Sequence, residues 1–208
     1  MCVDFFYIQS HVFLYTLSRN VKFHCIDAVE DRSKKIQLQY INGAVELYHN
    51  RGFRVNHIIA DSEFQCIKDN MCPIHVETVA KDDHVADIER GIRQFKNGVW
   101  GTVQSLPYWH YPKIMLHYLI TDTLKPMKFN PATDGISDHI SPLTMVTGQG
   151  APDYKQMKIE FGAYAQVFEE NQVTNTQDTR AIGCIALASY PDENGAFPFM
   201  NLNTGQVI

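Results

Sequence analysis

Short runs of apolar and β-branched residues predict strands in the first part of the chain. Three runs come before residue 30 and two more follow a longer helical stretch; they span residues 3–8, 11–17, 21–29, 55–61 and 74–80. Only Gln9 and Ser10 separate the first two runs, a spacing typical of a tight antiparallel hairpin. The pattern therefore predicts an antiparallel meander that later strands extend.

Two stretches repeat apolar residues at helical spacing. The first covers residues 33–50, with Gly52 just past its end, and the second covers residues 85–103. A right-handed crossover through the first helix would place the strand at 55–61 parallel to the strand at 3–8. This order of elements predicts an α/β fold, with a mixed five-stranded sheet flanked by helices.

The second half of the chain divides into a helical part and a β-rich part. Residues 107–128 look helical after Pro112, whereas residues 130–154 are rich in turn-forming residues and favour an extended connector. Three later runs predict a small all-β module; they span residues 159–167, 181–188 and 197–202. We expect three parts: a core at 1–106, a helical extension and connector at 107–155, and the β module at 156–208.

Composition narrows the class of protein. With 208 residues, 45% of them hydrophobic, the chain can bury a core. A net charge of −5 gives no overall basic character, so any contact with nucleic acid must be local. Five irregularly spaced cysteines favour a reducing compartment. No long apolar run and no signal peptide stand out, so we expect an intracellular protein of the nucleus or cytoplasm with no membrane contact.

Three acidic residues lie where the predicted elements would bring strand ends and a helix start together. Asp4 lies within the first strand, Asp61 ends the strand at 55–61, and Glu89 lies near the start of the second helix. If the three carboxylates converge, they offer hard oxygen ligands to a divalent metal. Each also has an ordinary alternative: Asp61 could cap a turn, and Glu89 could pair with Arg93 on an exposed helix face.

The order of elements and several short motifs resemble the RNase H-like catalytic core of retroviral and retrotransposon integrases. Asp61-Ser62-Glu63-Phe64 is similar to the second-aspartate motif of that family, and Glu89-Arg90 is similar to its glutamate-arginine pair. Later segments resemble those that follow the core in copia-type LTR retrotransposon polyproteins. These are residues 141–148, 161–164 and 201–208.

This resemblance implies a metal-dependent polynucleotidyl transferase that processes DNA 3′ ends and carries out strand transfer during DNA integration. It implies that Asp4, Asp61 and Glu89 are catalytic and hold two Mg²⁺ or Mn²⁺ ions. It further implies DNA contacts by Arg90, Arg93 and Lys96, although Arg93 and Lys96 could equally be ordinary surface charges. By the same resemblance, the chain acts as a homo-oligomer on DNA, and its β module forms a small barrel.

Some features depart from the family pattern and leave alternatives open. No Asn-Gly precedes Glu89, so Asp83 and Asp87 are alternative third acids. Met1 lies three residues before Asp4, and we therefore expect a polyprotein fragment without the family's zinc-binding module. A non-catalytic nucleic-acid-binding remnant, an RNase H-like nuclease and a protein-interaction domain are the alternative functions.

A second kind of metal site is also conceivable from the sequence. Cys66, Cys72 and His75 could bind zinc if a fourth ligand came from elsewhere. Cysteines that act as small core residues are the favoured interpretation.

Overall fold

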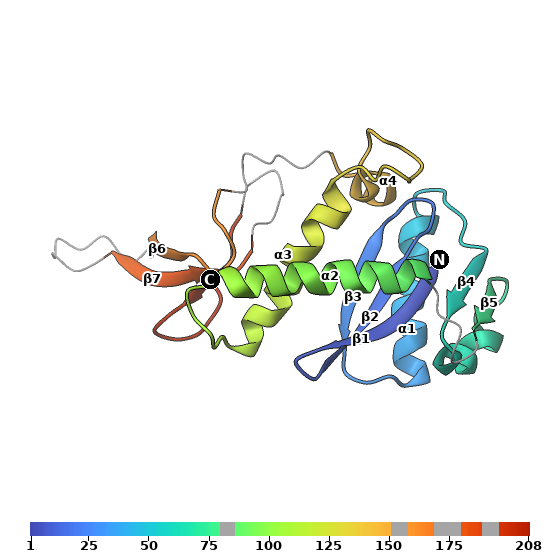
Figure 1. Cartoon of the computed structure of the whole chain (residues 1–208), viewed down its shortest axis with the longest axis horizontal. Helices are drawn as coiled ribbons and strands as arrows, with labels where there is room; N and C mark the ends of the chain where they lie inside the picture. Colours follow the sequence, from blue (N-terminus) through green and yellow to red (C-terminus); the bar gives the residue numbers. More distant parts are fainter. Residues whose placement is uncertain (80–85, 151–157, 169–179, 189–195) are drawn as a thin grey trace. The chain divides into compact units, whose positions relative to one another are not determined.

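The computed structural model describes residues 1–79, 86–150, 158–168, 180–188 and 196–208. Its elements, of which all but η1 and β8 are labelled in Figure 1, are β1 (Cys2–Ile8), β2 (His11–Leu17), β3 (His24–Val29), α1 (Lys34–His49), β4 (His57–Ala60), the 3₁₀ helix η1 (Ser62–Asn70), β5 (His75–Thr78), α2 (Ala86–Ser105), α3 (Lys113–Phe129), α4 (Pro142–Thr147), β6 (Tyr164–Phe168), β7 (Ala181–Ala186) and β8 (Phe199–Asn201).

The chain divides into two compact units. The first contains Met1–Asn97 and Leu124–Ala151, and the second contains Gly98–Thr123 and Pro152–Ile208. Helices α2 and α3 each supply residues to both units. The domain boundaries expected near residues 106 and 155 stay a prediction.

The first unit contains a five-stranded mixed sheet in the order β3-β2-β1-β4-β5. β1 pairs antiparallel with β2, and β2 with β3, whereas β4 pairs parallel with both β1 and β5. The predicted mixed five-stranded sheet is therefore confirmed. So is the parallel placement of the strand after α1 beside β1.

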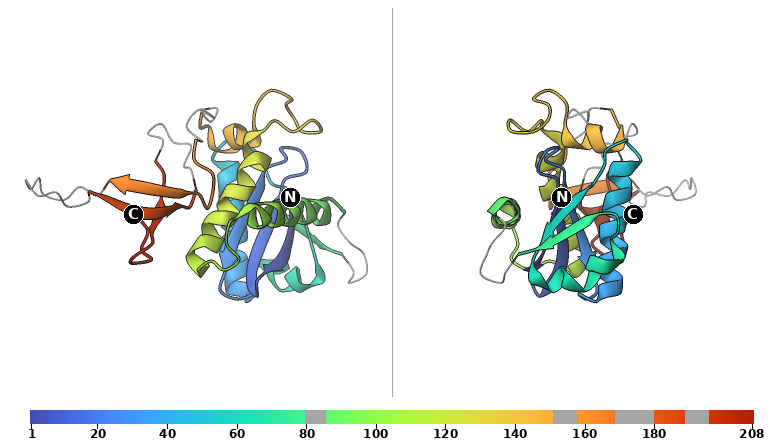
Figure 2. Two further views of the ribbon diagram at one scale, coloured as in Figure 1. Left: turned by 60° about the vertical axis from the view of Figure 1, so that its left-hand side comes forward. Right: turned by 90° about the vertical axis from the view of Figure 1, so that its right-hand side faces the viewer.

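Alternation along β1 divides its side chains between the two faces of the sheet. Val3 and Phe5 belong to the core cluster that α1, η1 and the sheet share. On the other face, Phe6 meets Phe95 of α2 edge-on, with ring centroids 5.7 Å apart. Figure 2 shows the sheet between α1 and α2. Asp4 alternates with Val3 and Phe5, so it lies on the face that α2 covers.

In the first unit, β3 and the expected connector differ from the sequence prediction. The strand expected at 21–29 begins only at His24, because Lys22 adopts a φ of 57° in the preceding turn. The connector expected at 130–154 contains the short helix α4. Ser141 accepts a hydrogen bond from the backbone of Thr144, and Gly148 ends the helix in the left-handed conformation. These local capping residues form a helical turn in an otherwise irregular segment.

The second unit contains an antiparallel three-stranded sheet in the order β6-β7-β8. A strand lies in each of the three predicted runs, although β6 begins only at Tyr164 and not at residue 159 as expected. Helix α3 starts directly after Pro112 as expected. Parts of the predicted β module, at 169–179 and 189–195, lie outside the described residues, and closure into a barrel stays a prediction. None of the helices in the described part of the chain has the length and apolar character that a bilayer crossing requires.

Candidate functional site

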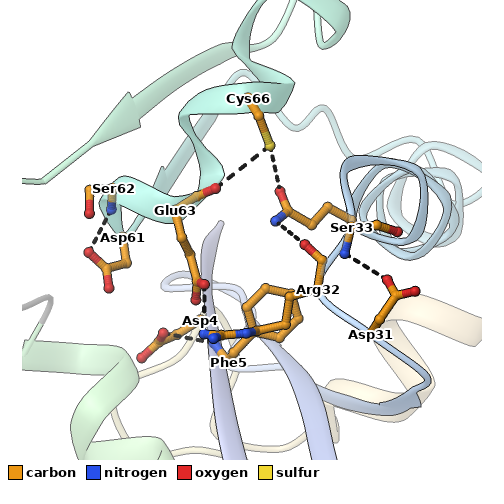
Figure 3. A network of polar contacts seen from close by, with 10 residues as sticks. Asp4, Phe5, Asp31, Arg32, Ser33, Asp61, Ser62, Glu63 and Cys66 are labelled. Atoms are coloured by element: carbon orange, nitrogen blue, oxygen red, sulfur yellow. Dashed lines mark hydrogen bonds and ion pairs between the residues drawn. The ribbon is translucent and has the colours of Figure 1, made fainter.

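Asp4 and Asp61 come together because of the register between two parallel strands. Val3 of β1 pairs with Ala60, the last residue of β4. Asp4 follows Val3 and Asp61 follows Ala60, so the two carboxylates occupy neighbouring positions at this end of β4. Asp4, Asp61 and Glu63 each offer an oxygen atom, and the three atoms lie within 4.8 Å of one another. Figure 3 shows the three side chains and their polar contacts.

Backbone amides fix the two aspartates. The Phe5 amide donates to Oδ1 of Asp4 over 2.7 Å, and the Ser62 amide donates to Oδ1 of Asp61 over 2.5 Å. The second contact makes Asp61 the N-cap of η1. The ordinary capping role considered from the sequence is therefore present, and it leaves the other carboxylate oxygen of Asp61 for a further ligand.

Glu63 is the acidic residue that the sequence did not identify as a ligand. The motif Asp61-Ser62-Glu63-Phe64 predicts a ligand role for Asp61 alone. The turn of η1 brings Glu63 back beside Asp4 and Asp61. Nη1 of Arg32 donates to Oε2 of Glu63 over 2.8 Å. The sequence signal for this role is a glutamate two residues after the aspartate that ends a strand, which a tight 3₁₀ turn can bring back beside that aspartate.

The electrostatics reflect several carboxylates in a partly buried place. Burial raises the pKa of Asp4 to about 6, and the charges of Asp61, Glu63 and Glu89 add to this rise. Burial also raises the pKa of Glu63, although the Arg32 guanidinium acts in the opposite direction. A bound cation would relieve the repulsion among these groups.

Glu89 lies near the start of α2, close enough to Asp4 for its charge to raise the pKa of that carboxyl. It is not among the three residues whose ligand atoms converge. Of the alternative third acids, Asp87 forms an ion pair with Arg19, with 2.7 Å between Oδ2 and Nε. Asp83 lies outside the described residues. Among the described residues, Glu63 and Glu89 are therefore the further acids whose charges act on Asp4 beside Asp61.

The three cationic residues predicted to contact DNA face different surroundings. The Lys96 ammonium lies 5.6 Å from the ring centroid of Phe6, on the sheet face that also carries Asp4. Arg93 is exposed on α2. Arg90 lines a separate cavity beside His24. Their roles in DNA binding stay predictions.

The alternative zinc site is not assembled. The Cys66 thiol donates weakly to Oε1 of Gln37 and to the Glu63 carbonyl, at 3.4 and 3.7 Å. Within the described ranges, the only group with metal-binding geometry is the acidic one, so Cys66, Cys72 and His75 form no such group. The three carboxylates supply hard oxygen donors, which fit Mg²⁺ or Mn²⁺ better than they fit zinc.

No protein-family model matches the sequence, and no curated protein matches it. Two solved structures that align with the chain are catalytic cores of retroviral integrases. The catalytic core domain of BIV integrase is 12% identical, with a TM-score of 0.49, over 71% of this chain and 92% of that one. The HTLV-2 integrase catalytic core domain, in complex with magnesium in a trimeric form, is 13% identical, with a TM-score of 0.45, over 70% and 95%. The function is therefore inferred from the chain's own residues.

Proposed function

We propose that the chain is an integrase-type polynucleotidyl transferase that processes DNA 3′ ends and joins them to target DNA with the help of Mg²⁺ or Mn²⁺. The observation that carries this proposal is the meeting of Asp4, within β1, and Asp61, just after the last residue of the parallel strand β4, which are distant in sequence. Glu63 and Glu89 add further acids from η1 and α2. Asp4 is an acid in a largely apolar strand, and in the described part of the chain no ion pair involves it, because Arg32 binds Glu63 instead.

The proposal assigns each acid a part. Asp4 and Asp61 would hold the metal ions, and Glu63 or Glu89 would complete the second site. When bound, the cations would stabilise negative charge on the attacking and leaving oxygens of a phosphodiester. Hydrogen bonds from the backbone amides of Phe5 and Ser62 keep the aspartates oriented before any ligand arrives.

Partners follow from the same proposal. The substrates would be the ends of a copia-type element and its target DNA, and the chain would assemble as a homo-oligomer on them. Lys96 lies on the sheet face that carries Asp4 and is suited to a nearby phosphate. The copia-type assignment, the polyprotein origin and the barrel rest on the short motifs after the core.

The test is metal-dependent nicking and joining of labelled oligonucleotides. We compare the wild-type chain with Asp61→Asn, and with Asp69→Asn as a matched control, because Asp69 is an exposed carboxylate of the same helix η1 outside the acidic group. We expect both reactions to require Mn²⁺ or Mg²⁺, to fall to background in Asp61→Asn and to persist in Asp69→Asn.

Other outcomes identify the alternatives. Cleavage of an RNA–DNA hybrid without joining would indicate an RNase H-like nuclease. A folded protein that binds DNA but shows no turnover above Asp61→Asn would contradict the transferase and indicate a non-catalytic remnant.

A further inference from the structure

Two cavities flank the loop 53–56 that leads into β4, at the opposite end of that strand from the acids. The first has a volume of about 340 Å³ and is lined by Arg19, Arg54 and His57, among others. The second has a volume of about 650 Å³, and His49 and Arg54 are among its lining residues. All lining residues of both cavities belong to the first unit. Arg54 therefore stands on the wall that the two cavities share.

Neither cavity has an aspartate or glutamate in its lining. This is informative because the whole chain carries 23 acidic and 18 basic residues. A third cavity, of about 470 Å³, combines Lys22 and Arg90 with Asp87 and Asp134. Carboxylates from outside the linings pair with Arg19, through Asp87, and with His57, through Glu77, whereas Arg54 has no ion pair among the described residues. The charge of Arg54 therefore favours an anionic ligand on this surface.

The hydrogen-bond donors on this surface suit a phosphate group. Arg54 is exposed and, within the described ranges, no ion pair involves it. Arg19 already binds Asp87 through Nε and hydrogen-bonds the Cys2 side chain, so Arg54 is the main cationic donor of this surface. Asn56 lines both cavities and carries amide donors. Arginine and asparagine side chains are common donors to nucleic-acid phosphates.

The position relative to the acids favours a polymer over a small anion. β4 contains four residues, His57–Ala60, and connects this surface to Asp61. Its length is roughly 13 Å at about 3.3 Å per residue. That distance is about four steps of the roughly 3.4 Å rise per nucleotide in a DNA strand. Arg54 lies three residues before this strand, so a nucleic-acid strand with one phosphate at the acids would need several nucleotides to reach it, a span that a small anion does not cover.

We infer that the two cavities around the loop 53–56 form a binding track for the phosphate backbone of a nucleic-acid strand, centred on Arg54. The choice of a nucleic acid as the ligand rests on the proposed function. The contact itself requires no divalent metal and no reaction, because it depends on the cationic and amide donors alone.

The test measures binding of a fluorescently labelled single-stranded oligonucleotide to the full chain in EDTA, at several salt concentrations. Arg54→Ala is compared with Arg51→Ala, which removes the same charge three residues earlier but lines neither cavity. We expect Arg54→Ala to weaken binding about fivefold to tenfold and to lower the salt slope by about 0.7 to 1. Arg51→Ala should change binding less than about twofold. Thermal melting verifies that both variants are folded.

Three results would overturn the inference. The first is wild-type protein that does not bind the oligonucleotide in EDTA, and the second is an equal loss of affinity in the two variants. The third is that inorganic phosphate raises the melting temperature of wild type but not of Arg54→Ala, while both proteins bind the oligonucleotide with the same affinity. The last result would identify a small phosphate ligand instead. Asp61→Asn should bind at least as tightly as wild type. Wild-type protein that binds the oligonucleotide in EDTA but does not nick it with Mn²⁺ or Mg²⁺ would count against the proposed reaction and leave the track intact.

Discussion

Asp4 lies in a strand beside other carboxylates, and its protonation links the site to the stability of the fold. Burial, with the charges of Asp61, Glu63 and Glu89, raises its pKa from 3.8 to about 6. The folded protein therefore binds this proton more tightly than the unfolded chain does between those values. By linkage, the free energy of unfolding falls as the pH rises from about 4 to about 6.

Asp4→Asn removes that dependence. In metal-free buffer above pH 6, we expect the variant to be more stable than wild type by about 1 kcal/mol, a value reduced to allow for the partial exposure of Asp4. Urea unfolding in EDTA at pH 4.5, 5.5 and 7 measures the effect. The same pH slope in both proteins would contradict the raised pKa.

The sequence identified Asp4 and Asp61 because strand patterns and chain order determine which strand ends meet. Glu63 was missed because its contribution depends on the tight turn of η1, which brings position i+2 back beside Asp61. Apolar periodicity does not encode that turn. The place of Glu89 near Asp4 follows from the packing of α2, and its role as a ligand stays a prediction.

At the scale of elements, α2 owes its close approach to the sheet to Gly91. A Cβ atom at this position would collide with the hydroxyl of Tyr15, which is fully buried and hydrogen-bonded to Nδ1 of His24 at 2.5 Å. The ring of Tyr15 has little room to move, so a larger residue would push α2 outward. Since Glu89 is two residues earlier on the same helix, its approach to Asp4 depends on Gly91.

Gly91→Ala should therefore reduce the free energy of unfolding by about 1 to 3 kcal/mol, as expected for overpacking. Gly101→Ala is the control on the same helix, because a Cβ there meets nothing within 4 Å. That change should be neutral or stabilise by up to about 1 kcal/mol. Chemical denaturation of both variants measures this, and equal effects would contradict the tight contact between α2 and β2.

Among the elements, long periodic stretches were the most predictable. The hairpin of β1 and β2, the crossover helix α1 and the helix α2 follow directly from the pattern of apolar residues. α4 was missed because six residues are too few to show periodicity, and its capping residues lie in a segment rich in loop formers. The start of β3 was placed too early because the apolar residues Val21 and Phe23 pack in a turn rather than in the strand.

At the scale of the whole molecule, the net charge is −5, so an anionic partner can be attracted only by local surfaces of the protein. The acids converge at one end of β4, and the cavities around Arg54 lie at its other end. Composition could not predict either surface, because both depend on the register and order of strands. The sheet order β3-β2-β1-β4-β5 is what brings distant residues together.

The central claim is that the acids around Asp4 and Asp61 act together as one divalent-cation site. Calorimetric titration of Mn²⁺ into wild type, Asp61→Asn and the control Asp69→Asn tests it most directly. We predict saturable binding to wild type and to Asp69→Asn, weakened at least about tenfold in Asp61→Asn. Equal Mn²⁺ affinity in all three folded proteins, or no binding to wild type, would contradict the account.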